Sequence, residues 1–203
     1  MNTQITPVDC LYGVDSLKGT GWIFHCHPSL GKIDVFINGL RIFKGLTYKL
    51  LSAPAAFPLG RCQIDLYKNG QLLTSAVMNI LSEEKLFIAV TGVGKKIDIR
   101  KYNFDFSVPT GEAAARFLHL APRLGTVDLS VHKGDVIFPS VNYLSATPFL
   151  PLSPVTFNLE ARKAGTKDIL LPMHQCSFNE STAYFLCLID DGQKFEKAAI
   201  KLK

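Results

Sequence analysis

Two imidazoles and a thiol stand together in the segment His25-Cys26-His27. Imidazole nitrogens and thiolate sulfurs are good ligands for Zn²⁺ or Cu²⁺, and a strand places residues 25 and 27 on one face. A closed site needs further ligands from elsewhere in the chain, such as His174 or Cys176. The alternative is that these are polar residues packed near the end of a strand. The sequence favours that alternative, so His25, Cys26 and His27 remain candidates while no metal or other cofactor is predicted.

His25 also belongs to a segment that occurs twice in the chain. When His25 is placed over His119, 94 positions later, histidine, proline, leucine, glycine and aspartate coincide without a gap. Cys26 and His27 have no counterparts in the second copy, which weakens the metal hypothesis. The recurring residues that we assign to a structural motif are His25, Pro28, Gly31, Asp34, His119, Pro122, Gly125 and Asp128.

Each copy pairs a histidine with an aspartate, namely His25 with Asp34 and His119 with Asp128. Such a pair could be an oriented acid and base of the kind that activates a nucleophile. An active site is rarely needed in both halves of a protein, whereas an imidazole that fixes the backbone of a turn is needed wherever that turn recurs. We therefore predict no catalytic residue and interpret both pairs as structural.

The residues around this motif predict strands. Asn38-Gly39 and Asn69-Gly70 follow apolar runs, and Asn-Gly is the strongest short signal for a β-hairpin because both central residues of a type I′ turn have positive φ. The second copy has Lys133-Gly134 in the place of Asn38-Gly39. No long stretch shows a convincing helical period with caps. Many short strands at roughly ten-residue spacing predict a sandwich or barrel.

The similarity between the copies continues beyond the motif. Ile64-Asp65-Leu66 aligns with Phe157-Asn158-Leu159, and residues 86–90 align with residues 184–188. Aromatic residues are expected to fill the cores of two sandwiches, and one or two of them could instead line a ligand groove. They are Trp22, Phe24, Phe36, Phe57 and Phe87 in the first sandwich, and Phe117, Phe138, Phe149, Phe157 and Phe185 in the second.

Residues 25–39, which read His-Cys-His-Pro-Ser-Leu-Gly-Lys-Ile-Asp-Val-Phe-Ile-Asn-Gly, resemble the signature of a bacterial family called domain of unknown function 4397. Pro58-Leu59-Gly60 is similar to a later element of that family. The resemblance covers nearly all of residues 21–203, and it implies tandem Ig-like β-sandwich modules. It implies no reaction, because the family's function is unassigned. Many members resemble secreted or surface-anchored proteins.

The predicted fold class is therefore all-β, with two tandem Ig-like antiparallel β-sandwich domains. We expect an N-terminal extension over residues 1–20, a first sandwich over 21–102, a linker over 103–112 and a second sandwich over 113–203. Residues 1–16 show neither the basic region nor the continuous apolar stretch of a secretory signal. The odd number of cysteines, 5, without a C-x-x-C spacing suggests no disulfide framework and a reducing compartment.

The charge pattern argues against nucleic acid. The net charge of +5 is dispersed, and Lys194, Lys197, Lys201 and Lys203 alternate with apolar residues as on a solvated face or a protected edge strand. No apolar run is long enough to span a bilayer, and no glycine-rich phosphate motif occurs. We therefore expect no nucleic-acid partner, no membrane insertion and no nucleotide.

These observations predict a non-enzymatic structural or binding protein that presents two β-sandwich modules to a protein or glycan partner. An alternative is a self-assembling building block of a bacterial envelope or spore layer, which fits a possible homo-oligomer with exposed sheet edges. A third is a metal-binding protein or enzyme that uses His25, Cys26 and His27. The expected location is cytoplasmic, or on a cell or spore surface reached without a signal peptide.

Overall fold

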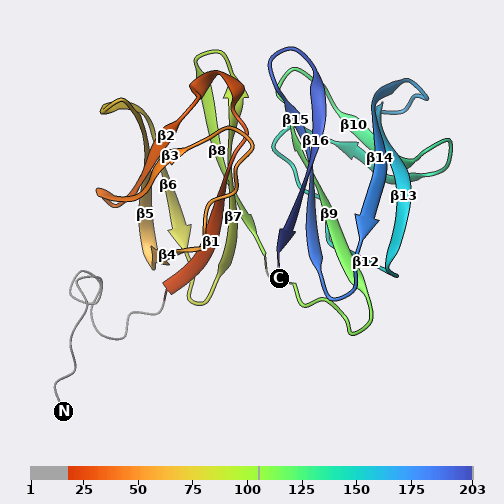
Figure 1. Ribbon diagram of the computed structural model, residues 1–203, viewed down its shortest axis with the longest axis horizontal. Helices are drawn as coiled ribbons and strands as arrows, with labels where there is room; N and C mark the ends of the chain where they lie inside the picture. Colours follow the sequence, from red (N-terminus) through yellow and green to blue (C-terminus); the bar gives the residue numbers. More distant parts are fainter. Residues whose placement is uncertain (1–17, 105, 203) are drawn as a thin grey trace.

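The computed structural model describes residues 18–104 and 106–202 (Figure 1). Most of the expected N-terminal extension (residues 1–17), Asp105 of the expected linker and Lys203 lie outside this description. The described part is almost entirely strand, with one short 3₁₀ turn, η1 (Pro28–Leu30). No helix in it is long and apolar enough to cross a membrane.

The first half of the chain forms one sandwich of two four-stranded sheets, with strand orders β4-β1-β7-β8 and β3-β2-β5-β6. The pairing is antiparallel except between β1 and β7, which run parallel. Its strands are β1 (Lys18–His25), β2 (Ile33–Ile37), β3 (Leu40–Leu46), β4 (Ala55–Pro58), β5 (Gly60–Lys68), β6 (Gln71–Ile80), β7 (Lys85–Val93) and β8 (Lys96–Asn103).

The second half repeats this arrangement with strand orders β12-β9-β15-β16 and β11-β10-β13-β14, again with one parallel pair, β9 with β15. The prediction of two β-sandwich domains is thus confirmed. The strands of the second sandwich are β9 (Ala113–Leu120), β10 (Val127–Val131), β11 (Val136–Val141), β12 (Leu150–Leu152), β13 (Val155–Lys163), β14 (Ile169–Phe178), β15 (Ala183–Asp190) and β16 (Phe195–Leu202).

The turns follow from local chemistry. Asn38 and Gly39 both have positive φ (49° and 81°), as do Asn69 and Gly70 (52° and 79°), which is the backbone of a type I′ hairpin. The turn at Lys133-Gly134 is wider, because the N–H of Val131 donates to the carbonyl of Asp135 (3.0 Å). This wider turn carries His132.

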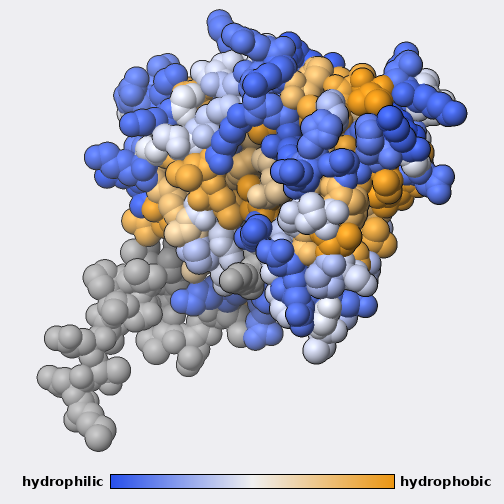
Figure 2. All heavy atoms as spheres, turned by 45° about the vertical axis from the view of Figure 1, so that its right-hand side comes forward, coloured by the Kyte–Doolittle hydropathy of each residue, from blue (hydrophilic) through white to orange (hydrophobic). Residues whose placement is uncertain are grey.

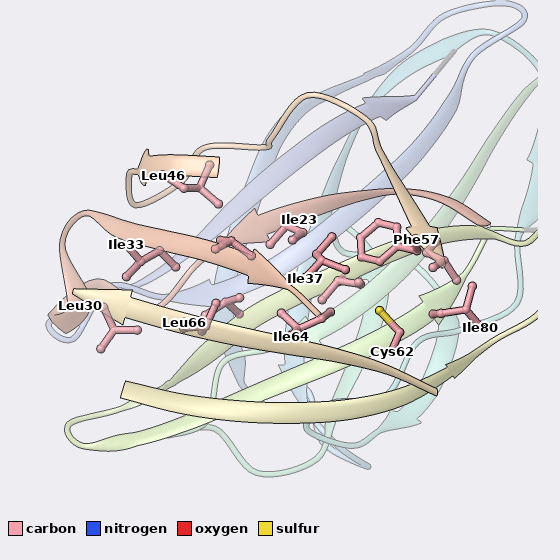
Figure 3. Close-up of a cluster of buried hydrophobic side chains, with 14 residues drawn as sticks. Ile23, Leu30, Ile33, Ile37, Leu46, Phe57, Cys62, Ile64, Leu66 and Ile80 are labelled. Atoms are coloured by element: carbon pink, nitrogen blue, oxygen red, sulfur yellow. The ribbon is translucent and has the colours of Figure 1, made fainter. Parts of the chain in front are cut away.

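Alternation along the strands fills the first core. On β2, Ile33, Val35 and Ile37 are fully buried while the residues between them are half-buried on the outer face. Ile64 and Leu66 of β5 lie beside Ile37 and Val35 in the same sheet, and the close-up shows the side chains of Ile33, Ile37, Ile64 and Leu66 between the two sheets (Figure 3). Burial of such side chains supplies the main driving force for folding.

A third core lies between the two sandwiches, where their inner sheets pack face to face. The four sheets form successive layers in Figure 1. The expectation that the aromatic residues fill only two cores is therefore wrong. The buried members of the third core are Phe24, Cys26, Phe87, Ala89, Tyr102, Phe104, Leu118, Leu120, Ala183, Phe185, Cys187 and Ile189, and the half-buried Trp22 and Phe149 pack against it.

This interface has approximate twofold symmetry. Strand pairing makes Phe185 the equivalent of Phe87, and the two rings stack on each other with centroids 4.5 Å apart at an interplanar angle of 12°. Polar contacts border the aromatic centre: the Tyr143 hydroxyl donates to Asp98 (2.9 Å), and the hydroxyl of Thr91 donates to the carbonyl of Leu120 (2.8 Å). The inner sheets are thus covered, which leaves the outer sheets and the strand edges for partners.

Candidate functional site

The motif histidine of the first sandwich closes a turn. Nε2 of His25 lies 2.8 Å from the carbonyl oxygen of Gly31, and its Nδ1 accepts the backbone N–H of His27 (3.4 Å). Nε2 must therefore carry the proton, which leaves the ring neutral. Burial lowers the pKa of His25, against a smaller raising effect of the Gly31 hydrogen bond. The imidazole has no free nitrogen for catalysis or for a metal.

The same geometry recurs in the second sandwich. Nε2 of His119 lies 2.8 Å from the carbonyl oxygen of Gly125, and Nδ1 accepts the N–H of Ala121 (3.3 Å). Burial lowers the pKa of this ring too. A tyrosine ring packs edge-on against each histidine, Tyr48 in the first copy and Tyr143 in the second.

The motif aspartates do not pair with these histidines. Asp34 accepts the backbone N–H of Gly45 (2.7 Å), and Asp128 accepts the N–H groups of Ser140 (2.7 Å) and Gly165 (2.8 Å). Asp34 and Asp128 therefore fix the bulged parts of β3 and β11, and Asp128 also fixes the turn between β13 and β14.

The His25-Cys26-His27 segment does not converge on one point. Cys26 is buried in the core between the sandwiches, where burial raises its pKa to about 12. Nε2 of His27 lies 3.0 Å from the carbonyl oxygen of Lys96, while its buried Nδ1 has no hydrogen-bond partner in the described part of the chain. His174 and Cys176 belong to the other sandwich, on β14. Among residues 18–104 and 106–202, no group of three or more His, Cys, Asp or Glu side chains could hold a metal ion.

The outer faces of the two sandwiches differ in chemistry. Strand pairing sets Phe36 opposite Asp65, and Ser130 opposite Glu160. Glu160 is thus the structural equivalent of Asp65, and the sequence alignment that placed Asn158 there is wrong by two residues. A shift of two keeps every side chain on the same face, so the alternation pattern could not reveal it.

A buried charged cluster occupies the outer face of the second sandwich. Glu160, 1% exposed, accepts hydrogen bonds from Nε of Arg162 (2.6 Å) and Nδ1 of His132 (2.8 Å). Burial alone would raise the pKa of Glu160, but these hydrogen bonds and the Arg162 charge together lower it. The cluster borders a depression of about 430 Å³. The buried hydroxyl of Ser130, opposite Glu160, has no partner among the described residues.

The contact between Glu160 and His132 resembles the carboxylate–imidazole pair that orients a general base in nucleophilic catalysis. Ser130 is fully buried, however, so its hydroxyl is closed to a substrate. Arg162 also donates to the carbonyl of Gly134 (3.0 Å), which ties the cluster to the β10–β11 turn. The arrangement therefore anchors the turn. No sequence motif pointed to this cluster; the one available signal is that Glu160 and Arg162 stand two positions apart, a spacing that puts both on one face of a strand.

At the equivalent place the first sandwich keeps a buried acid, Asp65, which accepts hydrogen bonds from Gln63 and Ser75. It has an aromatic pair, however, where the second sandwich has Ser130 and Arg162. Phe36 and Tyr67 pack together with ring centroids 4.7 Å apart. Leu72 pairs with Tyr67 on the neighbouring strand β6 and is 48% exposed. An apolar strip thus runs from β2 across β5 to the edge strand β6.

Edge strands present unpaired backbone groups, and proteins usually protect them with charges, proline, bulges or shortness. Seven of the eight edges in the described sheets are short or contain charged residues or proline. β4 and β12 are short, and β8 and β16 are rich in lysine. β3 contains Arg41 and Lys44, β11 contains Pro139, and β14 contains Pro172 and the positive φ of Gln175.

The eighth edge, β6, is long and has neither charge nor proline; its one device is a bulge near its start, where residues 72–74 lie opposite Leu66 and Tyr67 of β5. Its sequence Gln-Leu-Leu-Thr-Ser-Ala-Val-Met-Asn-Ile has no charge, proline or glycine over 10 residues. Val77, in its middle, is 50% exposed. Only the far end is capped, where Nζ of Lys101 donates to the carbonyl of Asn79 (2.8 Å). The uncharged run was visible in the sequence, but only the sheet order identifies it as an edge.

Comparison with known proteins gives one family. The model of the family described as Domain of unknown function (DUF4397) matches residues 22–130, which include the first sandwich and the motif of the second. No curated protein matches the chain.

Proposed function

Because the chain belongs to the family Domain of unknown function (DUF4397), whose description assigns no activity, we propose a function from the geometry: a non-enzymatic binding protein that captures an extended segment of a protein partner along β6. The observation that carries this proposal is that β6 alone among the described edges has neither a charged residue nor a proline along its 10 residues. Strand addition uses such an edge, since main-chain hydrogen bonds supply affinity and alternate side chains supply specificity.

The surroundings of β6 favour a protein over a glycan. The strip formed by Phe36, Tyr67 and Leu72 reaches the edge on the outer face, so alternate side chains of an added strand would meet apolar surface there. The equivalent edge strand in the second sandwich is β14. Pro172 of β14 lies opposite Glu160, and Ser75 of β6 lies opposite the equivalent acid, Asp65, so β14 has a proline where β6 has a serine. The difference between two otherwise similar halves supports a role for the β6 edge.

Self-assembly is the second candidate, because an unprotected edge can also pair with the β6 of another copy. Light scattering of the purified chain separates the two. A monomer at micromolar concentration supports capture of a different protein. A dimer that dissociates when Val77 is changed to lysine supports self-assembly.

The test of partner capture uses a photo-crosslinking residue at position 72, an exposed position of β6, in the native host, followed by mass spectrometry of the crosslinked peptide. We expect one protein to be linked through an extended segment, and we expect Val77→Lys to abolish capture, because a lysine on an edge disfavours pairing. The matched control is His174→Lys on β14, which adds the same charge to the protected edge.

Capture that survives Val77→Lys, or that is lost equally in His174→Lys, would overturn the proposal. Circular dichroism melting checks both variants. Val77 and His174 are exposed, so each change should alter the free energy of unfolding by less than about 0.5 kcal/mol.

A further inference from the structure

A cleft of about 220 Å³ opens between the edge strands β14 and β16 of the second sandwich. Phe178, Tyr184 and Leu186, all nearly fully buried, form its apolar floor. Figure 2 brings the second sandwich forward and shows hydrophobic surface between hydrophilic patches on this side of the molecule. An apolar cavity on the order of 150 Å³ is already large enough for a benzene-sized ligand.

The cleft exists because the two sandwiches differ at this seam. In the first sandwich, Ile97 and Ile99 of β8 pack against the core. The strand pairing of β16 puts Lys197 at the place of Ile99 and the small, exposed Ala199 at the place of Lys101. Because alanine is much smaller than lysine, Ala199 leaves part of the apolar floor uncovered.

Two lysines stand at the mouth of the cleft. Nζ of Lys197 donates to the carbonyl of His174 and lies 3.6 Å from Sγ of Cys176, and Nζ of Lys201 lies 5.8 Å from the centre of the Tyr184 ring. Neither lysine forms an ion pair with an acid in the described part of the chain. The mouth is therefore cationic, whereas the floor is apolar.

The apolar floor continues into the sandwich. Phe178 and Leu186 also line a second cavity, of about 30 Å³, whose accessible surface is wholly apolar. The two spaces thus meet at these two side chains. Rotation of either side chain would lengthen the cleft toward the opposite seam of the sandwich.

We propose that this cleft binds a medium-chain fatty acid, with the carboxylate paired to one of the two lysines that flank Ala199, Lys197 or Lys201, and the acyl chain over Phe178 and Leu186. A cationic mouth on an apolar floor is complementary to an anionic head on a hydrocarbon chain. This site is separate from β6, which lies in the other sandwich, so either proposal can fail alone.

The test measures displacement of a fluorescent fatty acid from the full chain by decanoate, with decanol as the neutral analogue. We expect saturable binding, with decanoate at least tenfold stronger than decanol. Lys197→Met combined with Lys201→Met should remove this preference, because methionine keeps an unbranched apolar side chain without the charge. The matched control, Lys32→Met with Lys44→Met, removes two exposed lysines from the first sandwich and should change nothing.

A second variant tests the apolar floor. Ala199→Phe places a ring in the cleft at an exposed position, so it should fold normally and weaken decanoate binding at least tenfold. Absence of saturable binding to the wild-type chain would overturn the proposal. Equal affinity of the Ala199→Phe variant, or unchanged preference for decanoate in the lysine variant, would overturn it as well.

Discussion

Replacement of Phe185 by alanine should damage the interface between the sandwiches more than any surface change. The ring is fully buried and stacks on Phe87 with ring centroids 4.5 Å apart. Its centroid lies 5.5 Å from the ring centroids of both Phe104 and Phe149. Truncation of a buried phenylalanine costs about 3–5 kcal/mol, of which about 0.5–1.5 kcal/mol belongs to an aromatic pair such as that with Phe87. This is a large share of the roughly 5–15 kcal/mol that stabilises a typical domain.

Guanidinium unfolding followed by two probes measures the effect. The fluorescence of Trp22, the only tryptophan, reports the first sandwich, and far-ultraviolet circular dichroism reports both sandwiches. We expect the two transitions to coincide in the wild-type protein, because the buried interface couples the sandwiches. They should separate in Phe185→Ala, since the interface loses its central contact.

The matched control is Phe57→Ala, which truncates an equally buried ring inside the first sandwich core. It should lower the free energy of unfolding by a similar amount, because the same side chain is lost from a fully buried position. The reasoning would be refuted if the wild-type transitions already failed to coincide. It would also be refuted if Phe185→Ala cost less than about 1 kcal/mol, well below the expected range.

Three further predictions concern backbone, pH and thiols. Gly92→Ala should destabilise the protein by at least about 1–3 kcal/mol in urea unfolding, because φ is +137° and an added Cβ would lie 2.1 Å from the carbonyl oxygen of Lys96; Gly94→Ala, with open space around it, should cost less. The free energy of unfolding should fall as pH drops below about 6.5, since the lowered pKa values of His25 and His119 let the unfolded chain bind protons first; a flat profile between pH 7 and 5 would contradict this. The buried thiol of Cys26, with a pKa of about 12, should react with a thiol reagent only as fast as the protein opens, which timed mass spectrometry can follow.

The histidine contacts of the duplicated motif are local in sequence. His25 and Gly31 are 6 residues apart, and the same contact recurs between His119 and Gly125. A corner of strand, turn and strand needs only residues near one another in the chain, so spacing carries the information. The Asn-Gly hairpins are predictable for the same reason.

The sequence by itself determined the two β-sandwiches and the alternation of buried and outward side chains along their strands. The tertiary structure alone decided which apolar faces meet, and it placed Phe87 against Phe185, 98 positions away, in a third core. It also decided that β6 is an edge and that β14 and β16 frame a cleft. Alternation fixes the face on which a side chain lies, but what covers that face, or borders that strand, depends on contacts distant in sequence.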